Sequence, residues 1–238
     1  MRCSELRIRG TRIVISLEHR KHQLNITEIP RSKGFMKLHR LTLTILASMS
    51  MPISFVWLTY VIKPTIVNSM VLDTIVATSV LYLARALGVR GIRIAWVELD
   101  LVGFLLPFAL SLDLAIRSNE IVQSLAHLPL CCAYSAINSA SSHNAIYLNV
   151  VRYVLTTSTI VAASVGIDTL TALPLPFVLG IAIYTDLAYF LVRRGRTTIL
   201  RIGGAGISDA IYLGTTMLNA TLALIASILA ALDTLSTR

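Results

Sequence analysis

The stretch LPLPFVLGIAIYTDLAYFLV, residues 173–192, carries a single charged side chain, Asp186, among residues that are otherwise mostly apolar. A helix needs roughly 20 such residues to cross a hydrocarbon core about 30 Å thick. The stretch therefore predicts a membrane-spanning helix, and it places one carboxyl group inside that helix.

The rest of the chain has the same character. Hydrophobic residues make up 55% of the 238 residues and charged residues only 14%, and the apolar residues form long blocks rather than the stripes of a soluble helix. Six further blocks are predicted to be membrane-spanning helices: 41–62, 65–84, 94–116, 121–137, 145–167 and 202 to about 232. The block 121–137 is short and contains Pro129, so a broken or re-entrant helix is an alternative there. The expected fold is an all-α, polytopic transmembrane bundle of about seven helices.

Lysine and arginine residues are unevenly distributed between the predicted loops, and this distribution predicts the orientation. With the N-terminus in the cytoplasm, the inner loops carry most of the basic residues, and the outer side keeps Lys63, Arg117 and Arg238. The net charge of +9 then faces an anionic leaflet. We expect the bilayer of the plasma or inner membrane as partner, and no nucleic acid, because no basic surface interleaved with aromatic residues is visible. The inner-side residues are Arg85, Arg90, Arg93, His143, Arg152, Arg193, Arg194, Arg196 and Arg201.

Residues 1–40 form a separate basic segment, followed by the transmembrane domain of residues 41–238. The segment alternates in a strand-like way over LRIRGTRIVISLE. Two interpretations stay open: a cytoplasmic extension, or a mis-assigned start with the true start at Met36. The apolar run after Met36 is too long for a signal peptide and predicts an anchor helix.

The cysteines Cys3, Cys131 and Cys132 show no metal-ligand spacing. The stretch Gly203-Gly204-Ala205-Gly206 lacks the lysine of a phosphate-binding loop. We therefore expect neither a metal ion nor a cofactor.

Acidic residues inside a bilayer are costly and are functional candidates by default. Glu98 lies near Arg93 and Asp113 near Arg117, so both are interpreted as interfacial acids. The remaining candidates within the predicted spans are Asp73, Asp100, Asp186 and Asp209.

Asp186 and Asp209 are predicted at the same depth. Asp186 lies seven residues before Arg193, and Asp209 lies eight residues after Arg201. At about 1.5 Å per residue, they sit roughly 10 and 12 Å from the same inner interface. Consecutive helices are usually neighbours, so the two carboxyl groups can face each other.

Two facing carboxyl groups in a dry site share one proton and titrate as a unit. The ionised group can then activate water while the protonated group polarises a peptide carbonyl, as in aspartic proteases. Nearby glycines allow close backbone approach, either for helix packing or for a substrate strand. The hypothesis is a peptidase-like site for a membrane protein or peptide, with Asp186 and Asp209 as catalytic residues. The supporting residues are Tyr184, Gly203, Gly204, Gly206 and Asp100.

Three blocks carry a resemblance to a known family: Asp100 to Pro107, Gly180 to Leu187, and Ile202 to Leu213 with the sequence IGGAGISDAIYL. Through them the region 98–232 resembles an uncharacterised family of small prokaryotic multi-pass membrane proteins. In this chain Asp100 replaces the asparagine of the family pattern and Val102 replaces a glycine. A family block rich in proline and glycine is not recognisable around residues 138–144. The resemblance implies an architecture without a known activity.

A looser resemblance is to intramembrane aspartyl proteases of the presenilin and signal-peptide-peptidase type. These have Tyr-Asp in one helix and Gly-x-Gly-Asp in the next, which Tyr184-Thr-Asp186 and Gly206-Ile-Ser-Asp209 approximate. The chain departs from the pattern at Thr185 and Ser208, and no Pro-Ala-Leu motif follows. The resemblance implies that Asp186 and Asp209 are the catalytic pair.

Two alternatives of other classes remain open. An ion- or proton-coupled transporter of small solutes would use intramembrane acids spread along a path between broken helices. A non-catalytic scaffold would use its aspartates to cap polar contacts between helices. The residues favouring transport are Asp73, Asp100 and Asp186, with breaks at Pro52, Pro107, Pro129 and residues 203–206.

Overall fold

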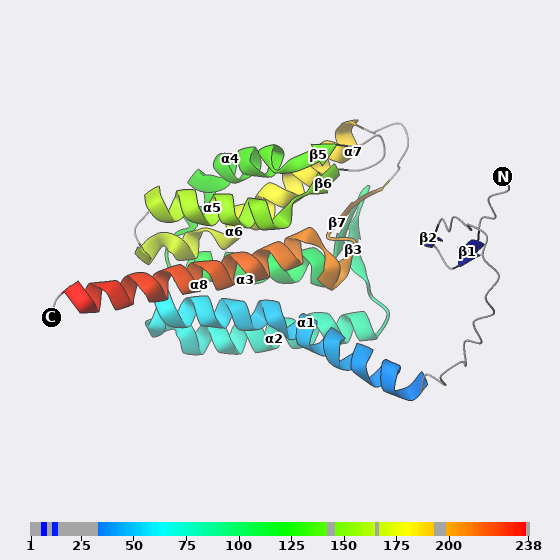
Figure 1. The fold of residues 1–238 in the computed structure, drawn as a ribbon, viewed down its shortest axis with the longest axis horizontal. Helices are drawn as coiled ribbons and strands as arrows, with labels where there is room; N and C mark the ends of the chain where they lie inside the picture. The colour runs from blue at the N-terminus through cyan, green and yellow to red at the C-terminus, as the bar shows by residue number, and fades with distance from the viewer. Residues whose placement is uncertain are drawn as a thin grey trace, which may run out of the picture. The chain divides into compact units, whose positions relative to one another are not determined.

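The computed structural model describes residues 6–8, 11–13, 33–141, 146–164, 167–192 and 199–236 (Figure 1). The chain divides into two units, Met1–His39 and Arg40–Arg238. In the first unit, β1 (Leu6–Ile8) and β2 (Thr11–Ile13) pair antiparallel. The second unit is a bundle of helices with a small sheet at one end, and it holds every candidate site residue.

Two long helices come first in the helical part of the chain. α1 (Lys33–Ile62) is followed by the 3-10 turn η1 (Pro64–Ile66) and by α2 (Val67–Ala86). Pro52 lies inside α1 and has no N–H to donate, which frees the carbonyl of Ser48 four residues earlier. That carbonyl accepts hydrogen bonds from the hydroxyl groups of Tyr212 at 2.6 Å and Tyr82 at 3.3 Å. The proline is therefore accommodated by polar contacts from two other helices.

A three-stranded sheet interrupts the third predicted span. β3 (Gly91–Ile94) and β4 (Val97–Asp100) form an antiparallel hairpin, and β7 (Leu200–Ile202) pairs parallel to β4, so that the order is β3-β4-β7. Helical structure begins only with the π-helix η2 (Leu101–Leu105), which continues into α3 (Leu106–Arg117). The predicted helix over 94–116 is therefore wrong for residues 94–100.

The chain continues through five helices, α4 to α8, and three of them differ from the prediction. In the predicted span 145–167, residues 146–148 form a strand and the helix begins only at Val150. α4 (Ile121–Ile137) runs without a break past Pro129, so the alternative of a broken helix is wrong. The last helix, α8 (Ala210–Ser236), begins at Ala210 rather than at residue 202. The other elements are β5 (Ser139–Ser141), β6 (Ile146–Leu148), α5 (Val150–Ser164), η3 (Ile167–Ala172), α6 (Pro174–Ile181), the π-helix η4 (Ala182–Ala188), α7 (Tyr189–Val192) and η5 (Gly206–Ser208).

Four segments of the described chain are long and apolar enough to cross a membrane: Thr44–Ile62, Pro64–Ala86, Thr169–Ala188 and Ala210–Leu235. Many large apolar side chains on α1, α2 and α8 are exposed, among them Leu46, Leu72 and Leu224. Exposed apolar surface on this scale is typical of a lipid-facing bundle. The protein is therefore a helical membrane protein, while the number of passes and the orientation stay predictions.

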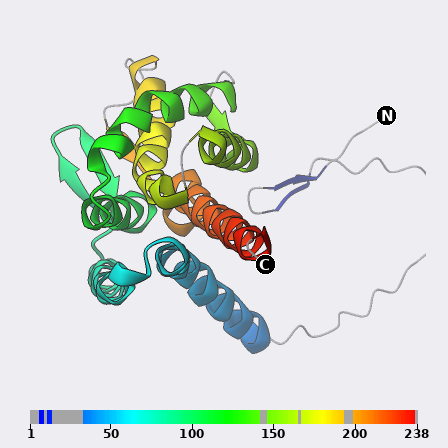
Figure 2. The ribbon, with the colours of Figure 1, turned by 90° about the vertical axis from the view of Figure 1, so that its left-hand side faces the viewer.

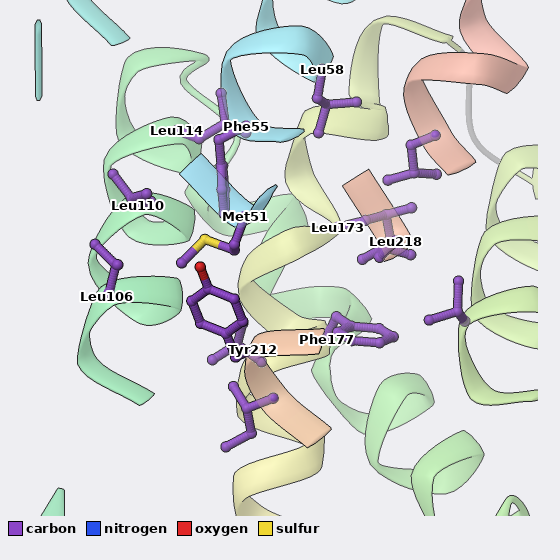
Figure 3. Close-up of a cluster of buried hydrophobic side chains, with 14 of the residues drawn as sticks. Met51, Phe55, Leu58, Leu106, Leu110, Leu114, Leu173, Phe177, Tyr212 and Leu218 are labelled. Carbon is purple, nitrogen blue, oxygen red and sulfur yellow. The ribbon is translucent and has the colours of Figure 1, made fainter. Parts of the chain in front are cut away.

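The segment that contains α6 is the most buried of the four, because 67% of its most apolar stretch lies inside the protein. α6 contacts α3, α4 and α8, as the view along the helices in Figure 2 shows. Figure 3 shows Phe177 of α6 in the same core as Met51 of α1, Leu110 of α3 and Tyr212 of α8. This central position of α6 holds η4, which directly follows it, at the end of the bundle where the sheet lies.

Candidate functional site

The three sequence blocks that carry the candidate residues meet at one end of the bundle. β4 and β7 pair in parallel with Leu99 opposite Ile202. Beyond the strands, η2 contacts η5, and η4 contacts β7. This arrangement brings together Asp100 at the end of β4, Asp186 within η4, and Asp209 just before α8.

Glycines allow the backbones to approach closely at this junction. A Cβ atom at Gly103 would lie 2.0 Å from the carbonyl oxygen of Gly203, and Gly203 itself has a φ of +75°. Gly206 has a φ of +62°, and a Cβ there would lie 2.9 Å from the guanidinium group of Arg85. Gly204 has no such restriction, because the nearest atom to its Cβ position is 3.6 Å away. Gly203 and Gly206 thus serve close packing within the chain.

Asp100 is the N-cap of η2. Its Oδ1 atom accepts hydrogen bonds from the N–H groups of Val102 at 3.0 Å and Gly103 at 2.7 Å. The same oxygen accepts a bond from Nη1 of Arg85 at 3.3 Å. These contacts satisfy N–H groups that the first turn of a helix leaves without partners.

Asp209 has the same relation to α8. Its Oδ1 accepts a hydrogen bond from the N–H of Ile211 at 2.9 Å, and its Oδ2 accepts one from Ala205 at 3.3 Å. Asp209 precedes Ala210, the first residue of the α8 span. Burial raises the pKa of Asp209, the two N–H groups act in the opposite direction, and the charge of Asp100 raises the pKa further. Asp100 and Asp209 are therefore close enough to interact.

Asp186 differs from both, since it lies inside η4 and caps no helix. The carboxyl group of Asp209 and the backbone N–H of Gly203 lie close enough to act on it electrostatically. The hydroxyl of Thr185 lies 3.4 Å from its Oδ1 atom. Tyr184 precedes it in the same π-helix and is partly buried. π-Helical turns are rare and are frequent at functional sites.

Arg85 is a member of this cluster that the sequence did not single out. Its guanidinium group contacts Asp100 and lies over Gly206, and its side chain is 39% exposed. The sequence marks Arg85 only as an inner-side loop residue, because no local pattern predicts which acid a loop arginine contacts. We call Arg85, Asp100, Asp186 and Asp209 the acid cluster.

The remaining acids of the predicted spans lie elsewhere. Asp113 contacts Nε of Arg117 at 2.9 Å, and Asp73 also pairs with Arg117. Arg117 is the last residue of α3, the end opposite Asp100. Glu98 pairs with Arg201 at 3.0 Å rather than with Arg93. Asp73 is therefore separate from the acid cluster.

Within the described residues, no group of three or more histidine, cysteine or acidic side chains could hold a metal ion. Cys131 is buried, and its carbonyl oxygen accepts a hydrogen bond from Tyr153 at 3.1 Å. His143 and the basic residues Arg193, Arg194, Arg196 and Arg238 of the orientation prediction lie outside the described residues.

No protein-family model, curated protein or solved structure matches this chain. Both family resemblances therefore stay predictions that rest on the three sequence blocks.

Proposed function

We propose that this membrane protein carries an aspartyl-peptidase-like site formed by Asp186 and Asp209. The observation behind the proposal is that the carboxyl group of Asp209 lies close enough to that of Asp186 to act on it electrostatically, at a junction lined by glycines. The two aspartates come from the π-helix η4 and from the residue directly before α8. An aspartyl peptidase requires such a pair and no cofactor.

The surroundings of the two carboxyl groups suggest different roles. Asp209 lies at the N-terminus of α8, where the helix dipole favours negative charge. It accepts hydrogen bonds from the N–H of Ile211 in α8 and from the N–H of Ala205 in the preceding loop. We assign it as the base that takes a proton from water. Asp186 lies in η4 without a helix terminus beside it, and we assign it as the acid that donates a hydrogen bond to the scissile carbonyl. Asp100 and Arg85 support the site by fixing the start of η2.

An extended peptide is the substrate form that fits the surroundings best. β7 lies at the edge of the three-stranded sheet, so one of its sides pairs with no other described strand. Exposed sheet edges bind extended peptides through main-chain hydrogen bonds. β7 ends one residue before Gly203, so a segment added there would lie beside the acid cluster. A membrane protein or membrane-associated peptide is the proposed substrate.

The test uses purified protein in lipid vesicles with a pool of single-span peptides, and mass spectrometry detects the fragments. We expect cleavage by the wild type and by Asp113→Asn, a control acid at the other end of α3. Asp186→Asn and Asp209→Asn are expected to lose cleavage by at least about a thousandfold, because neither retains an acid and base pair. Equal cleavage by either variant, or no cleavage by the wild type, contradicts the proposal.

A non-catalytic scaffold is the second candidate, and one observation favours it. Asp100 and Asp209 each cap a helix, which is the role expected of aspartates that only hold helices together. Asparagine is as good an N-cap as aspartate, so a scaffold is expected to tolerate Asp209→Asn. The transporter alternative is less favoured, because Asp73 pairs with Arg117 away from the acid cluster.

A further inference from the structure

A groove runs between α1 and α2, outside the Asp186 and Asp209 pair. One part, with a volume of about 350 Å³, lies between Pro52 and Ile53 of α1 and Val71 and Ile75 of α2. A second part of about 460 Å³ reaches Tyr82 and Arg85. Met49 lines both parts, so they adjoin and form one groove along the two helices.

The groove is apolar along its length and cationic at one end. Its walls in the first part are almost entirely apolar, and Ile53 and Ile75 are 63% and 58% exposed. Arg85 lies in the last turn of α2, the end of a predicted span, and its guanidinium group is accessible. An arginine at a span end places its charge at the membrane interface while its neighbours stay in the hydrocarbon.

The length of the groove matches one leaflet. Val71 and Arg85 are fourteen positions apart in α2, which corresponds to about 21 Å along the helix. One leaflet, counted together with its polar headgroup region, is about 20 to 22 Å thick. An occupant with its head at Arg85 therefore has room for an extended chain down to the level of Val71.

We propose that this groove binds one anionic glycerophospholipid, with its phosphate at Arg85 and one acyl chain between α1 and α2. A guanidinium group binds phosphate through paired hydrogen bonds. Basic pockets between helices on the cytoplasmic side are suited to anionic head groups. The orientation predicted from the loop charges places Arg85 on that side, which agrees with the charge of the proposed head group.

The proposed lipid also contacts the acid cluster through Arg85. The guanidinium group donates to Asp100 at 3.3 Å through Nη1, and a phosphate would approach it from the groove. Arg85 would then lie between a carboxylate and a phosphate, which compensates more of its charge. The binding proposal does not depend on peptidase activity.

The test measures which lipids stay bound to the purified protein. The protein is equilibrated with equal amounts of phosphatidylglycerol and phosphatidylcholine of matched acyl chains, and native mass spectrometry counts the lipids retained. A single interfacial cation predicts about fivefold preference for the anionic lipid. Arg85→Gln is expected to remove this preference, whereas the exposed Arg93→Gln is expected to keep it.

A second variant and a competition measurement test lipid binding even where Arg85→Gln folds poorly. Ile53→Trp fills the apolar part without touching Arg85 and is expected to reduce retention of both lipids. Glycerol phosphate, which has the head group without acyl chains, is expected not to compete. Unchanged retention by Ile53→Trp, or competition by glycerol phosphate at the same concentration as the lipid, overturns the proposal.

A protein partner is the other possible occupant. Thr74 and Thr78 line the groove, and their hydroxyl oxygens are buried without a hydrogen-bond partner in the described part of the chain. If cross-linking from Ile53→Cys yields a stoichiometric protein adduct and lipids are not retained, the lipid proposal is wrong.

Discussion

The carboxyl groups near the two ends of α3 have different kinds of partner. At the Arg117 end, Asp73 and Asp113 pair with that arginine, and the buried Glu120 pairs with Lys63 at 3.3 Å. At the other end, the three aspartates of the acid cluster have one arginine among the described residues and are bonded mainly to backbone N–H groups.

This difference separates acids whose partners are supplied by the fold from acids that are free to take part in chemistry. A carboxylate held by a cation, or by the N–H groups of a helix start, already has its partners. Asp186 has neither a described ion pair nor a helix to cap, and the groups that act on it are Asp209, Gly203 and Thr185. It is therefore the acid whose position is least explained by folding alone.

The largest expected effect on the acid end comes from Gly103→Ala. The new Cβ would lie 2.0 Å from the carbonyl oxygen of Gly203, which is backbone and cannot move aside cheaply. We expect a loss of at least about 3 kcal/mol of stability, the upper range for overpacking. The measurement is the free energy of unfolding in mixed micelles.

Gly204→Ala is the matched control, because its Cβ position has ordinary contacts at 3.6 Å. It is expected to change stability by less than about 0.5 kcal/mol. Equal effects of the two variants would show that the close approach of η2 and the glycine loop does not position the acid cluster.

At the opposite end, Glu120→Ala tests the paired arrangement. The Glu120 side chain is 6% exposed, and besides Lys63 it accepts a hydrogen bond from Thr171 at 2.5 Å. Its removal leaves a cation and a buried hydroxyl without their partner. Because Lys63 is 28% exposed and water can reach it, we expect about 2 kcal/mol of destabilisation rather than the full cost of a buried ion.

The control is Glu98→Ala, which removes a pair whose Arg201 side chain is 67% exposed. Exposed pairs contribute about 0.2 to 1 kcal/mol. If Glu98→Ala costs as much as Glu120→Ala in thermal unfolding, burial is not what distinguishes these ion pairs.

The sequence predicts the membrane class well, because long apolar blocks have few other uses. It fails at residues 94–100, where IAWVELD is apolar enough to extend a span but belongs to a hairpin with Ala95 at a φ of 53°. The start of α8 can also be predicted from the sequence, because the three glycines within residues 203–206 are a strong signal against a helix.

The candidate site was only partly accessible from sequence. The helical rise per residue predicts one depth for Asp186 and Asp209, but the sequence does not indicate which of the two is the acid and which is the base. An aspartate directly before an apolar helix is an N-cap signal, and it applies to both Asp100 and Asp209. The contact between Arg85 and Asp100 depends on how α2 packs against η2, which no local pattern encodes.

A smaller effect is expected for Arg117→Gln. The variant leaves Asp73 and Asp113 without their shared cation. Both carboxyl groups are partly exposed, so water replaces much of the lost interaction and we expect about 1 kcal/mol of destabilisation. The loss measured in mixed micelles is expected to shrink as salt is added. A loss that is independent of salt would show that Arg117 acts through packing.

The smallest effect, and the one that most sharpens the comparison, is at Asp209. Asp209→Asn keeps an oxygen that accepts from the N–H of Ile211, so stability is expected to change by less than about 0.5 kcal/mol. Asp209→Ala removes that acceptor and is expected to cost about 1 kcal/mol. Unfolding of the two variants in mixed micelles measures the difference. If the asparagine variant is as unstable as the alanine variant, the carboxylate charge rather than the cap stabilises the start of α8. If instead asparagine preserves the fold while cleavage is lost, the capping and catalytic roles of one carboxyl group are separated, and the acid cluster is more than a device for joining helices.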